Sequence, residues 1–481
     1  MLEPNLARTK IIATLGPSCG KQSQMEAMIL AGVDAFRFNM SHGDDATRRK
    51  WVASVKRARR KLARPVSMIC DLRGPRIRMG RLDDDVELTV GEKLTLKVGK
   101  SMSKDGFLPV DYRAFVKDVS KGDRVLLRDG RAELVVLSKT DKLVQCRIDR
   151  GCTLSSNQGV NLPDSSVSAP ALSAKDRADI AFAVEMKMDW VALSFVRTAK
   201  DIKTLQRAIA KQGGDIPIIA KIEHPEAVDN LDAILEATDA AMVARGDLAV
   251  EMGHEVVPTI QKRIVRRAIA ASTPVIVATQ MLESMMSAAQ PTRAEVSDVA
   301  NAVVDGVDAV MLSGETAVGE YALEACQLMH RIASRTESEL FTENWRLKPS
   351  VNRLGLPGST ITLSIVNAAI QATHQANAQL ILAFTESGRT PCLVSSFRAQ
   401  VPIIAVTSRR ATFHRLALLW GVRPAVIKRS RGFADRNRAA HLLLKESGLL
   451  KLDDLLTVLT GSFQVSGTTR TLRLLRLRDL V

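Results

Sequence analysis

The chain has 481 residues, of which 46% are hydrophobic, 25% charged and 4% aromatic, and its formal net charge is +16. This length favours two to four domains, and the balance of apolar and charged residues excludes a disordered or collagen-like chain. No apolar run is long enough to span a bilayer, and the first residues lack the layout of a signal peptide. We therefore expect no membrane partner.

The six cysteines are scattered and form no C-x-x-C pair. This pattern favours reduced thiols in the cytoplasm over a disulfide framework or a zinc site. The positive charge is compatible with nucleic acid or with phosphorylated small molecules. Aromatic residues are not interleaved with the basic ones, and the densest basic cluster, residues 57–64, follows a predicted helix. We interpret that cluster as a solvated face and predict no nucleic-acid partner.

The N-terminal segment alternates strands and helices. Apolar runs predict strands, and amphipathic runs predict the helices between them. The strands are expected at 9–15, 35–38 and 66–71, and the helices at 22–31 and 45–61. Repeated βα units of this length indicate a parallel sheet with right-handed crossovers.

The spacing of apolar residues changes over residues 81–164. Short alternating runs occur at 86–90, 93–98, 124–127 and 132–137, and Asp129-Gly130 is a hairpin signal between the last two. No long amphipathic helix is indicated here. We predict an inserted all-β domain, a β-barrel placed as a lid.

Strand–helix alternation resumes over residues 165–345. Strands are expected at 190–195, 216–222, 240–243, 275–279 and 309–312, and helices at 174–186, 199–211, 227–237, 260–272, 297–305 and 322–339. Together with residues 1–80 this makes eight strands, each followed by a helix. The predicted fold is therefore α/β, a closed (β/α)8 catalytic barrel interrupted by the lid.

A third region covers residues 346–481 and begins with a linker at 348–359. Helices are expected at 361–377, 390–398 and 412–420, and strands at 380–385, 403–406 and 423–427. The pattern predicts a smaller, open α/β domain with a regulatory or interface role.

Charged and polar residues gather where the predicted barrel strands end, which is the rim that carries barrel active sites. Lys221 and Glu223 are two residues apart and share a face of their strand. Glu223 and Asp247 offer hard oxygen ligands without histidine or cysteine, which selects Mg²⁺ or Mn²⁺. A plain ring of salt bridges is the alternative. The rim residues are Arg37, Asn39, Asp71, Arg73, Arg78, Phe195, Arg197, Lys221, Glu223, Asp247, Thr279, Gln280, Ser313 and Glu315.

Eight motifs in order along the chain resemble those of pyruvate kinases. They are 8-RTKIIATLGPS-18, 36-FRFNMSHG-43, 71-DLRGP-75, 220-AKIE-223, 242-MVARGD-247, 278-ATQMLESM-285, 291-PTRAE-295 and 311-MLSGET-316. The similarity continues more weakly to the C-terminus. It implies phosphoryl transfer from phosphoenolpyruvate to ADP, giving pyruvate and ATP in glycolysis, and a homotetramer.

The resemblance also implies roles for individual residues. Lys221 would lie by the moving phosphoryl group, Arg37 would bind phosphate, and Thr279 would help to position the group that protonates the enolate. Glu223 and Asp247 would hold Mg²⁺. Substrate contacts are implied for Arg37, Lys221, Gly246, Asp247, Thr279, Ser313 and Glu315, and nucleotide contacts for Asn39, Ser41, His42 and Arg78.

The chain departs from the family at a potassium site. Matching ligands are present at Asn39, Ser41, Asp71 and the carbonyl of Leu72, but Arg76 replaces an acidic residue of potassium-activated members. We expect Arg76 to act as an internal cation, so that K⁺ is not required. The alternative is an intact ion site with Arg76 in solvent.

Two further regions differ from the family. Asn157-Gln158 stands where a lid lysine is common, which leaves the nucleotide contact of the lid open. Residues 385–390 resemble an effector phosphate loop, with candidate contacts Thr385, Ser387, Gly388, Arg389 and Thr390. Glu386 would repel a phosphate, so we expect another effector or none rather than a sugar bisphosphate. A plain helix start is as compatible with these residues as an effector site.

Two rival classes remain at this point. A Mg²⁺-dependent aldolase or lyase of 2-oxo acids also places Glu and Asp at barrel strand ends, but it leaves Arg37, Arg73, Arg78 and the lid unexplained. A basic nucleic-acid binder would need its charge away from the rim.

Overall fold

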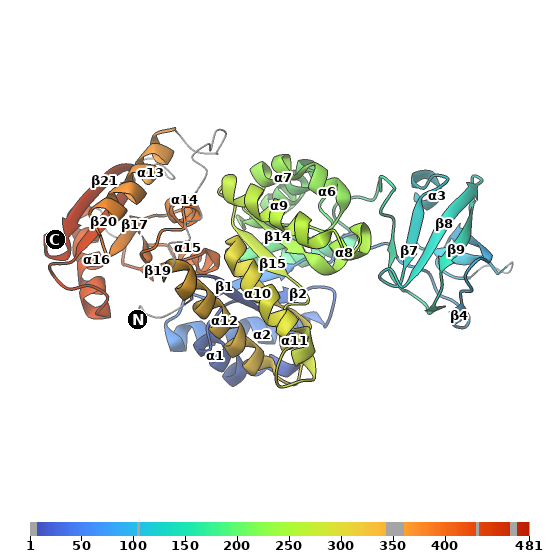
Figure 1. The fold of residues 1–481 in the computed structure, drawn as a ribbon, viewed down its shortest axis with the longest axis horizontal. Coiled ribbons are helices and arrows are strands. Elements are labelled where there is room, and N and C mark those ends of the chain that lie inside the picture. The colour runs from blue at the N-terminus through green and yellow to red at the C-terminus, as the bar shows by residue number, and fades with distance from the viewer. Residues whose placement is uncertain (1–6, 103–105, 343–359, 430–431, 462–468, 481) are drawn as a thin grey trace.

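The computed structural model describes residues 7–102, 106–342, 360–429, 432–461 and 469–480. Three bodies follow one another along the long axis, with the barrel between the C-terminal domain and the inserted β domain (Figure 1). The inserted domain and the C-terminal domain therefore contact opposite ends of the barrel.

Within the described part of the chain, no helix has the length and apolar character needed to cross a membrane.

Eight parallel strands close into a barrel in the order β1-β16-β15-β14-β13-β12-β3-β2. Strands β3 and β12 are neighbours although the whole insertion separates them, and Ile69 is in register with Trp190. The closed barrel expected from the sequence is thus confirmed. The strands are β1 (Lys10–Thr14), β2 (Val33–Asn39), β3 (Ser67–Asp71), β12 (Trp190–Leu193), β13 (Ile218–Ile222), β14 (Ala240–Ala244), β15 (Val275–Ala278) and β16 (Ala309–Leu312).

Helices surround the strands and bury a large apolar layer between the two. A second cluster fills the barrel itself with residues such as Ile12, Ile69, Ile219 and Met311. The main helices are α1 (Gln22–Leu30), α2 (Asp45–Leu62), α4 (Ala174–Glu185), α5 (Ala199–Lys211), α6 (Pro225–Asp229), α7 (Leu231–Ala237), α8 (Arg245–Met252), α9 (Val257–Ala270), α10 (Arg293–Asp305), α11 (Gly314–Ala317) and α12 (Ala322–Thr342). Short 3₁₀ turns are η1 (Pro17–Cys19) and η2 (Glu283–Met286).

The helix expected at 227–237 is instead two helices, α6 and α7. They meet at Asn230, whose side-chain amide donates to the carbonyls of Glu226 and Arg197. Asparagine competes in this way with the helical hydrogen bonds of the backbone, so the chain breaks there. The expectation of one continuous helix was wrong for this reason.

The insertion between β3 and α4 is a separate β domain with its own apolar core. Its main sheet has the order β11-β7-β8-β9-β5-β6, and β10 pairs with β4. The predicted hairpin is present, because Leu127 pairs with Ala132 around Asp129-Gly130. The elements are β4 (Val86–Glu87), β5 (Lys93–Val98), β6 (Leu108–Val110), α3 (Phe115–Asp118), β7 (Arg124–Leu127), β8 (Ala132–Lys139), β9 (Leu143–Arg150), β10 (Thr153–Leu154) and β11 (Val160–Asn161).

The C-terminal domain contains a five-stranded sheet in the order β19-β18-β17-β20-β21, in which β21 is antiparallel. Helices α13 and α14 pack on one face and α16 on the other. The predicted linker at 348–359 lies outside the described residues. The elements are α13 (Thr360–Gln375), β17 (Leu380–Phe384), α14 (Arg389–Ser396), β18 (Ile403–Thr407), α15 (Arg410–Arg415), η3 (Leu416–Leu418), β19 (Val422–Val426), α16 (Phe433–Ser447), β20 (Leu455–Gly461), β21 (Thr469–Arg476) and η4 (Leu477–Asp479).

The C-terminal domain covers the amino-terminal end of the barrel. Leu418 of η3 is fully buried in the cluster that fills the barrel. Arg398 pairs with Asp308, just before β16, with Nη2 2.9 Å from Oδ2, and both side chains are buried. The opposite rim, formed by the carboxyl ends of the strands, is therefore the one that remains for a ligand site.

Candidate active site

The register of β2 and β3 brings the first charged residues of the rim together. Asn39 is aligned with Asp71, and Arg37 shares the face of Asn39 because it is two residues earlier. Arg37 Nε lies 2.6 Å from Asp71 Oδ2, and Arg37 Nη1 donates to Thr14 Oγ1 at 3.2 Å. The guanidinium is thereby fixed at the end of two adjacent strands.

Lys221 lies next to this pair at the end of β13. Its ammonium nitrogen is 2.7 Å from Glu223 Oε1 and 3.5 Å from Asp71 Oδ1, and it donates to Ser194 Oγ at 2.6 Å. Burial acts to lower the pKa of Lys221, but the carboxylates of Asp71 and Glu223 outweigh it and raise that pKa. Lys221 is thus a fixed cation in a buried position.

Glu223 is fully buried. Its Oε2 accepts a hydrogen bond from the Phe195 backbone N–H at 2.7 Å, whereas Oε1 faces only the Lys221 ammonium among the described residues. Burial raises the pKa of Glu223; Lys221 opposes this and Asp247 adds to it. One carboxylate oxygen is therefore free for a second cation.

Asp247 follows β14, the strand beside β13, and lies in the first turn of α8, where its side chain is half-buried. The neighbouring Gly246 N–H donates to Thr279 Oγ1 at 2.9 Å. A substrate carboxylate could bind Gly246, as the resemblance implies, only by replacing this internal bond.

Thr279 has a left-handed backbone conformation, with φ of 71°, and the following Gln280 has φ of 54°. A β-branched residue rarely adopts positive φ, and this costs of order 1–3 kcal/mol unless its surroundings impose it. Here Arg245 donates to the Thr279 carbonyl from Nη2 at 2.6 Å and is itself paired with Asp298 at 2.6 Å. The strain lies directly beside Gly246 and Asp247.

The two carboxylates fit a magnesium ion. Across the described ranges no cluster of three or more His, Cys, Asp or Glu could hold a metal, so the chain itself would supply few ligands. Mg²⁺ is commonly bound in this way, by one or two carboxylates together with substrate oxygens and water. Because Glu223 Oε1 contacts only the Lys221 ammonium among the described residues and Asp247 is reachable from solvent, these residues could hold it.

Ser313 and Glu315 follow β16, but their side chains differ in whether they are available to contact a substrate. Both Glu315 oxygens accept backbone N–H groups, Oε1 from Leu282 at 3.2 Å and Oε2 from Ser313 at 2.6 Å. The Ser313 hydroxyl is buried without a hydrogen-bond partner in the described structure. Glu315 therefore shapes the loop, and Ser313 is the better placed of the two for a substrate.

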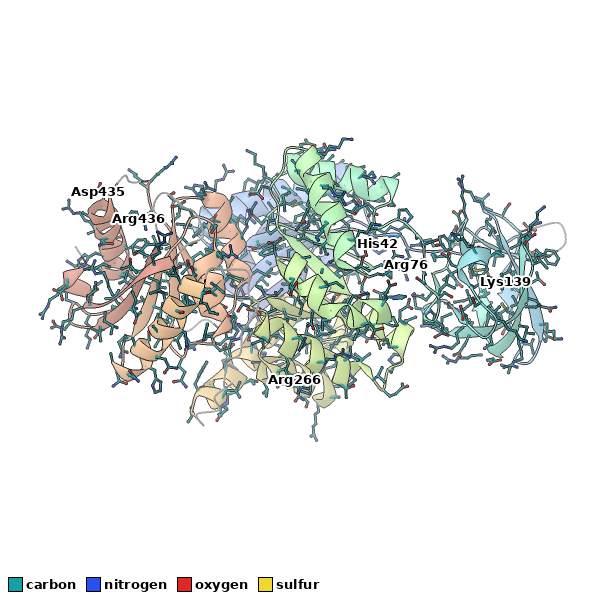
Figure 2. The ribbon with its side chains drawn as sticks, turned by 90° about the horizontal axis from the view of Figure 1, so that it is seen from above. His42, Arg76, Lys139, Arg266, Asp435 and Arg436 are labelled. Atoms are coloured by element: carbon teal, nitrogen blue, oxygen red, sulfur yellow. The ribbon has the colours of Figure 1, made fainter. Side chains whose placement is uncertain are left out.

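The expected nucleotide residues lie at the end of the barrel that faces the β domain, where Figure 2 places His42 and Arg76. Asn39 Oδ1 accepts the Ser41 N–H at 3.0 Å, and His42 is exposed. Arg78 donates to the carbonyl of Asn157 in the lid at 2.8 Å. These residues line the junction between the two domains.

Three of the four expected potassium ligands, Asn39, Asp71 and the Leu72 carbonyl, already have partners in the described structure. Asp71 pairs with Arg37 and Lys221, and the Leu72 carbonyl accepts the Ser194 hydroxyl at 2.8 Å. The Arg76 guanidinium lies 2.6 Å from Asp129 in the lid, which is the carboxylate it contacts within the described structure. Arg76 is thus bound to the lid in this conformation.

The expected effector loop is held by its own contacts. Thr385 Oγ1 accepts the Gly388 N–H at 2.9 Å, and the buried Thr390 hydroxyl lies 2.6 Å from that of Thr469. Glu386 accepts from Ser408 at 2.9 Å. The loop begins α14, and Thr390 is not open to a ligand.

Several residues of the site were not found from the sequence. Ser194 and Thr14 are unremarkable strand-end hydroxyls, and only the closed barrel places them on Lys221 and Arg37. Glu251 is buried on α8, where Asn161 of the lid donates to it at 2.6 Å. In the sequence, the one indication that Glu251 belongs to the site was its position four residues after Asp247, which places both carboxylates on the same face of a helix.

Fold and site together define a three-domain (β/α)8-barrel enzyme with a lysine and carboxylates at the carboxyl rim. Residues 6–326 match the family model for the pyruvate kinase barrel domain, and residues 363–475 match that for the pyruvate kinase alpha/beta domain. The chain belongs to the pyruvate kinase family, and it is a transferase.

Similar proteins cover nearly the whole chain. Pyruvate kinase 2 of Synechocystis is 39% identical over 96% of this chain and 78% of its own. The pyruvate kinase of Clostridium acetobutylicum is 38% identical over 97% and 99%. A crystal structure of a pyruvate kinase from Cryptosporidium parvum has a TM-score of 0.90 and 32% identity, covering 98% and 96%.

Proposed function

We propose that the rim carrying Lys221 and Glu223 is the site at which this chain, a member of the pyruvate kinase family, transfers a phosphoryl group from phosphoenolpyruvate to ADP, giving pyruvate and ATP. The observation that carries the proposal is the contact of one buried ammonium with Glu223 at 2.7 Å and with Asp71 at 3.5 Å. Phosphoryl transfer requires little covalent work from a protein, so positioning and charge stabilisation dominate. A fixed cation beside paired carboxylates supplies both.

Lys221 and Arg37 carry the positive charge of the proposed mechanism. Arg37 binds the phosphate, and its bonds to Asp71 and Thr14 hold the guanidinium in place for that contact. Lys221 stabilises the charge that develops on the phosphoryl group and the bridging oxygen. A cation about 4 Å from such a charge contributes roughly 4 kcal/mol at an effective dielectric constant of 20.

Glu223 and Asp247 are the proposed ligands of the divalent metal that this family requires. When bound, Mg²⁺ or Mn²⁺ would neutralise charge on the enolate and carboxylate oxygens of the substrate. Gly246, Thr279 and Ser313 would complete the substrate pocket, with Glu315 fixing the loop that carries Ser313. Thr279 would orient the group that protonates the enolate.

Asn39, Ser41, His42 and Arg78 are the proposed nucleotide contacts. They lie on the barrel side of the junction with the lid, and Arg78 reaches the lid backbone at Asn157. Closure of a lid at this rim would exclude water that otherwise hydrolyses a phosphoryl donor. The β domain over residues 81–164 is proposed to serve as that lid.

We further propose that K⁺ is not required, because Asp71 is already paired with two cations. Arg76 could act as an internal cation only after leaving Asp129. The loop that carries Thr385, Ser387, Gly388 and Arg389 is proposed as an effector site only for a ligand that tolerates Glu386, and Thr390 would support it from the interior. A homotetramer in the cytoplasm is the proposed assembly and location.

A coupled assay tests the reaction. Purified protein with Mg²⁺, phosphoenolpyruvate and ADP should form pyruvate, detected by reduction with lactate dehydrogenase and NADH, and should form none when ADP is omitted. Cleavage of a 2-oxo acid aldol without ADP would instead support the aldolase class. Absence of pyruvate under all these conditions would reject the proposed function.

A further inference from the structure

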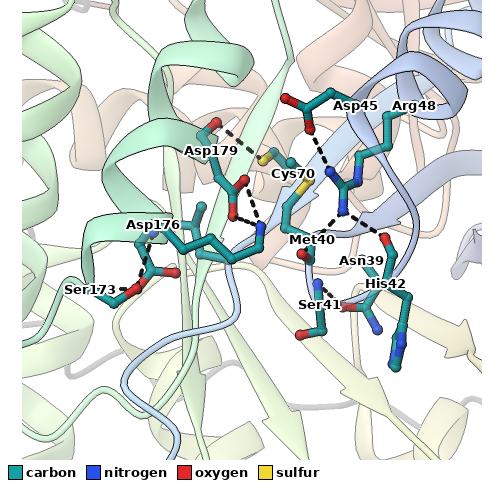
Figure 3. Close-up of polar contacts among 12 residues, drawn as sticks. Asn39, Met40, Ser41, His42, Asp45, Arg48, Cys70, Ser173, Asp176 and Asp179 are labelled. Carbon is teal, nitrogen blue, oxygen red and sulfur yellow. Dashed lines mark hydrogen bonds and ion pairs between the residues drawn. The ribbon is translucent and has the colours of Figure 1, made fainter.

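Arg48 in the first turn of α2 is a buried arginine that the proposed mechanism does not use. Its Nη2 donates to the carbonyls of His42 and Gly43 at 2.7 Å each and, at 3.3 Å, to that of Met40. Its Nη1 donates to Asp45 Oδ1 at 2.6 Å. Figure 3 shows the guanidinium between the Asp45 carboxylate and the stretch of chain that carries Met40, Ser41 and His42.

The carbonyls that meet on Arg48 belong to the loop between β2 and α2, residues 39–44. This loop carries Asn39, Ser41 and His42, three of the four proposed nucleotide contacts. Because hydrogen bonds to a charged donor are stronger than neutral ones, one guanidinium can fix several peptide groups at once. Arg48 thus holds the exposed loop from its buried side, in addition to the Asn39 amide that accepts the Ser41 N–H.

The orientation of these carbonyls decides what the loop presents to the outside. Every peptide bond described here is trans, so each N–H points away from the carbonyl of the same peptide unit. The N–H groups of Gly43 and Asp44 therefore face away from Arg48, and they have no acceptor within the described structure. Outward backbone N–H groups suit the phosphate oxygens of a nucleotide.

Two carboxylates at the start of α2 would repel such an anion if they were free. Asp44 caps the helix, and its Oδ1 accepts the Thr47 N–H at 2.8 Å. Asp45 is held by Arg48. Arg48 thus both shapes the loop and pairs with the acid nearest to it.

We infer that Arg48 is a positioning residue for ADP, which sets the loop 39–44 for the diphosphate and keeps the Asp45 carboxylate away from it. The inference rests on the proposed function, because it takes the loop as the nucleotide site. Arg48 makes no contact with Lys221 or Glu223 in the described structure, so its effect falls on one substrate.

Steady-state kinetics of matched variants test the inference. Arg48→Met should raise KM for ADP by roughly tenfold or more, because a charged donor shared by three carbonyls is lost. KM for phosphoenolpyruvate and turnover at saturating ADP should change little. Arg48→Lys should fall between, and adding Asp45→Asn to Arg48→Met should recover part of the loss. The neighbouring Arg49→Met, which removes an exposed pair with Glu185, is the control.

Amide hydrogen exchange gives a readout that does not need activity. In Arg48→Met the peptides covering residues 39–44 should exchange faster than in the wild type and in Arg49→Met, while those of β13 and β14 stay unchanged. A parallel rise in KM for both substrates, or an unchanged KM for ADP, would overturn the inference. Faster exchange in a protein without pyruvate formation would reject the proposed function but retain the positioning of the loop.

Discussion

The ammonium nitrogen of Lys221 lies 2.7 Å from Oε1 of Glu223, and both groups are buried at the end of β13. An ammonium and a carboxylate this close would ordinarily neutralise each other and leave no net charge to bind a ligand. Here Asp71 and Asp247 add negative charge around the lysine, and Glu223 Oε1 meets no other donor in the described residues. The excess of negative charge from these carboxylates allows a divalent cation to bind beside the lysine.

Replacement of Lys221 by Met should remove most turnover while phosphoenolpyruvate still binds. Loss of roughly 4 kcal/mol of charge stabilisation corresponds to about a thousandfold in rate. Turnover is measured by pyruvate formation and binding by isothermal titration. Lys262→Met, on the outside of the barrel where Lys262 pairs with Asp305, is the control. Near-normal turnover of Lys221→Met would refute the assignment.

Ser194→Ala should lower kcat/KM for phosphoenolpyruvate by about tenfold, because the hydroxyl accepts from Lys221 and donates to the Leu72 carbonyl. Without it the ammonium loses one of the groups that orient it. The ratio kcat/KM for phosphoenolpyruvate is the measurement, and the exposed Ser297→Ala is the control. An unchanged ratio would show that Glu223 and Asp71 alone position the lysine.

Glu251 should make stability depend on pH. Burial raises its pKa from 4.5 to about 7; the Asn161 hydrogen bond opposes this, and Asp247 and Glu223 add to it. Because the folded pKa is the higher one, the stabilisation is complete below about pH 4.5 and is lost as the pH rises through 7. A shift of this size corresponds to roughly 3 kcal/mol.

The Glu251→Gln variant should therefore be more stable than the wild type at pH 8 and similar to it at pH 5, without Mg²⁺ or substrates. Urea unfolding at the two pH values is the measurement. The exposed Glu236→Gln provides the control and should follow the wild type at both. Parallel curves for wild type and Glu251→Gln would contradict the prediction.

Turnover should persist when K⁺ is replaced by tetramethylammonium, because Arg37 and Lys221 already neutralise Asp71. Arg76→Glu, which restores the acidic residue of potassium-activated relatives, should make the rate depend on K⁺. The assay is pyruvate formation across a K⁺ titration for both proteins. Strict dependence of the wild type on K⁺ would reject the internal-cation hypothesis.

Arg398→Met should destabilise the contact between the barrel and the C-terminal domain. Removing one partner of a buried pair leaves Asp308 uncompensated, which costs about 3–5 kcal/mol. The midpoint of urea unfolding is the measurement. Arg335→Met breaks an exposed pair with Glu339 and should cost no more than about 0.5 kcal/mol. Equal losses of stability in the two variants would show that the buried pair contributes no more to stability than the exposed pair.

Local patterns in the sequence were sufficient for the barrel and its rim. Apolar runs between helical patterns located all eight strands, and parallel strands place their carboxyl ends on one edge, so Lys221, Glu223 and Asp247 were expected to converge. The Asp129-Gly130 turn was found for a similarly local reason, because its residues suit positive φ. The break at Asn230 was missed, because the amide competes with the helix through a contact to Arg197 on another loop.

Only the tertiary structure decided which partner each charged group takes. Arg76 is paired with Asp129 across the domain junction, and Ser194 accepts a hydrogen bond from Lys221, which lies on another strand. Such contacts depend on strand register and domain placement, which vary independently of local composition. The sequence by itself determined where charge would lie on the rim, whereas packing determined which charges are neutralised inside the protein and which remain for a ligand.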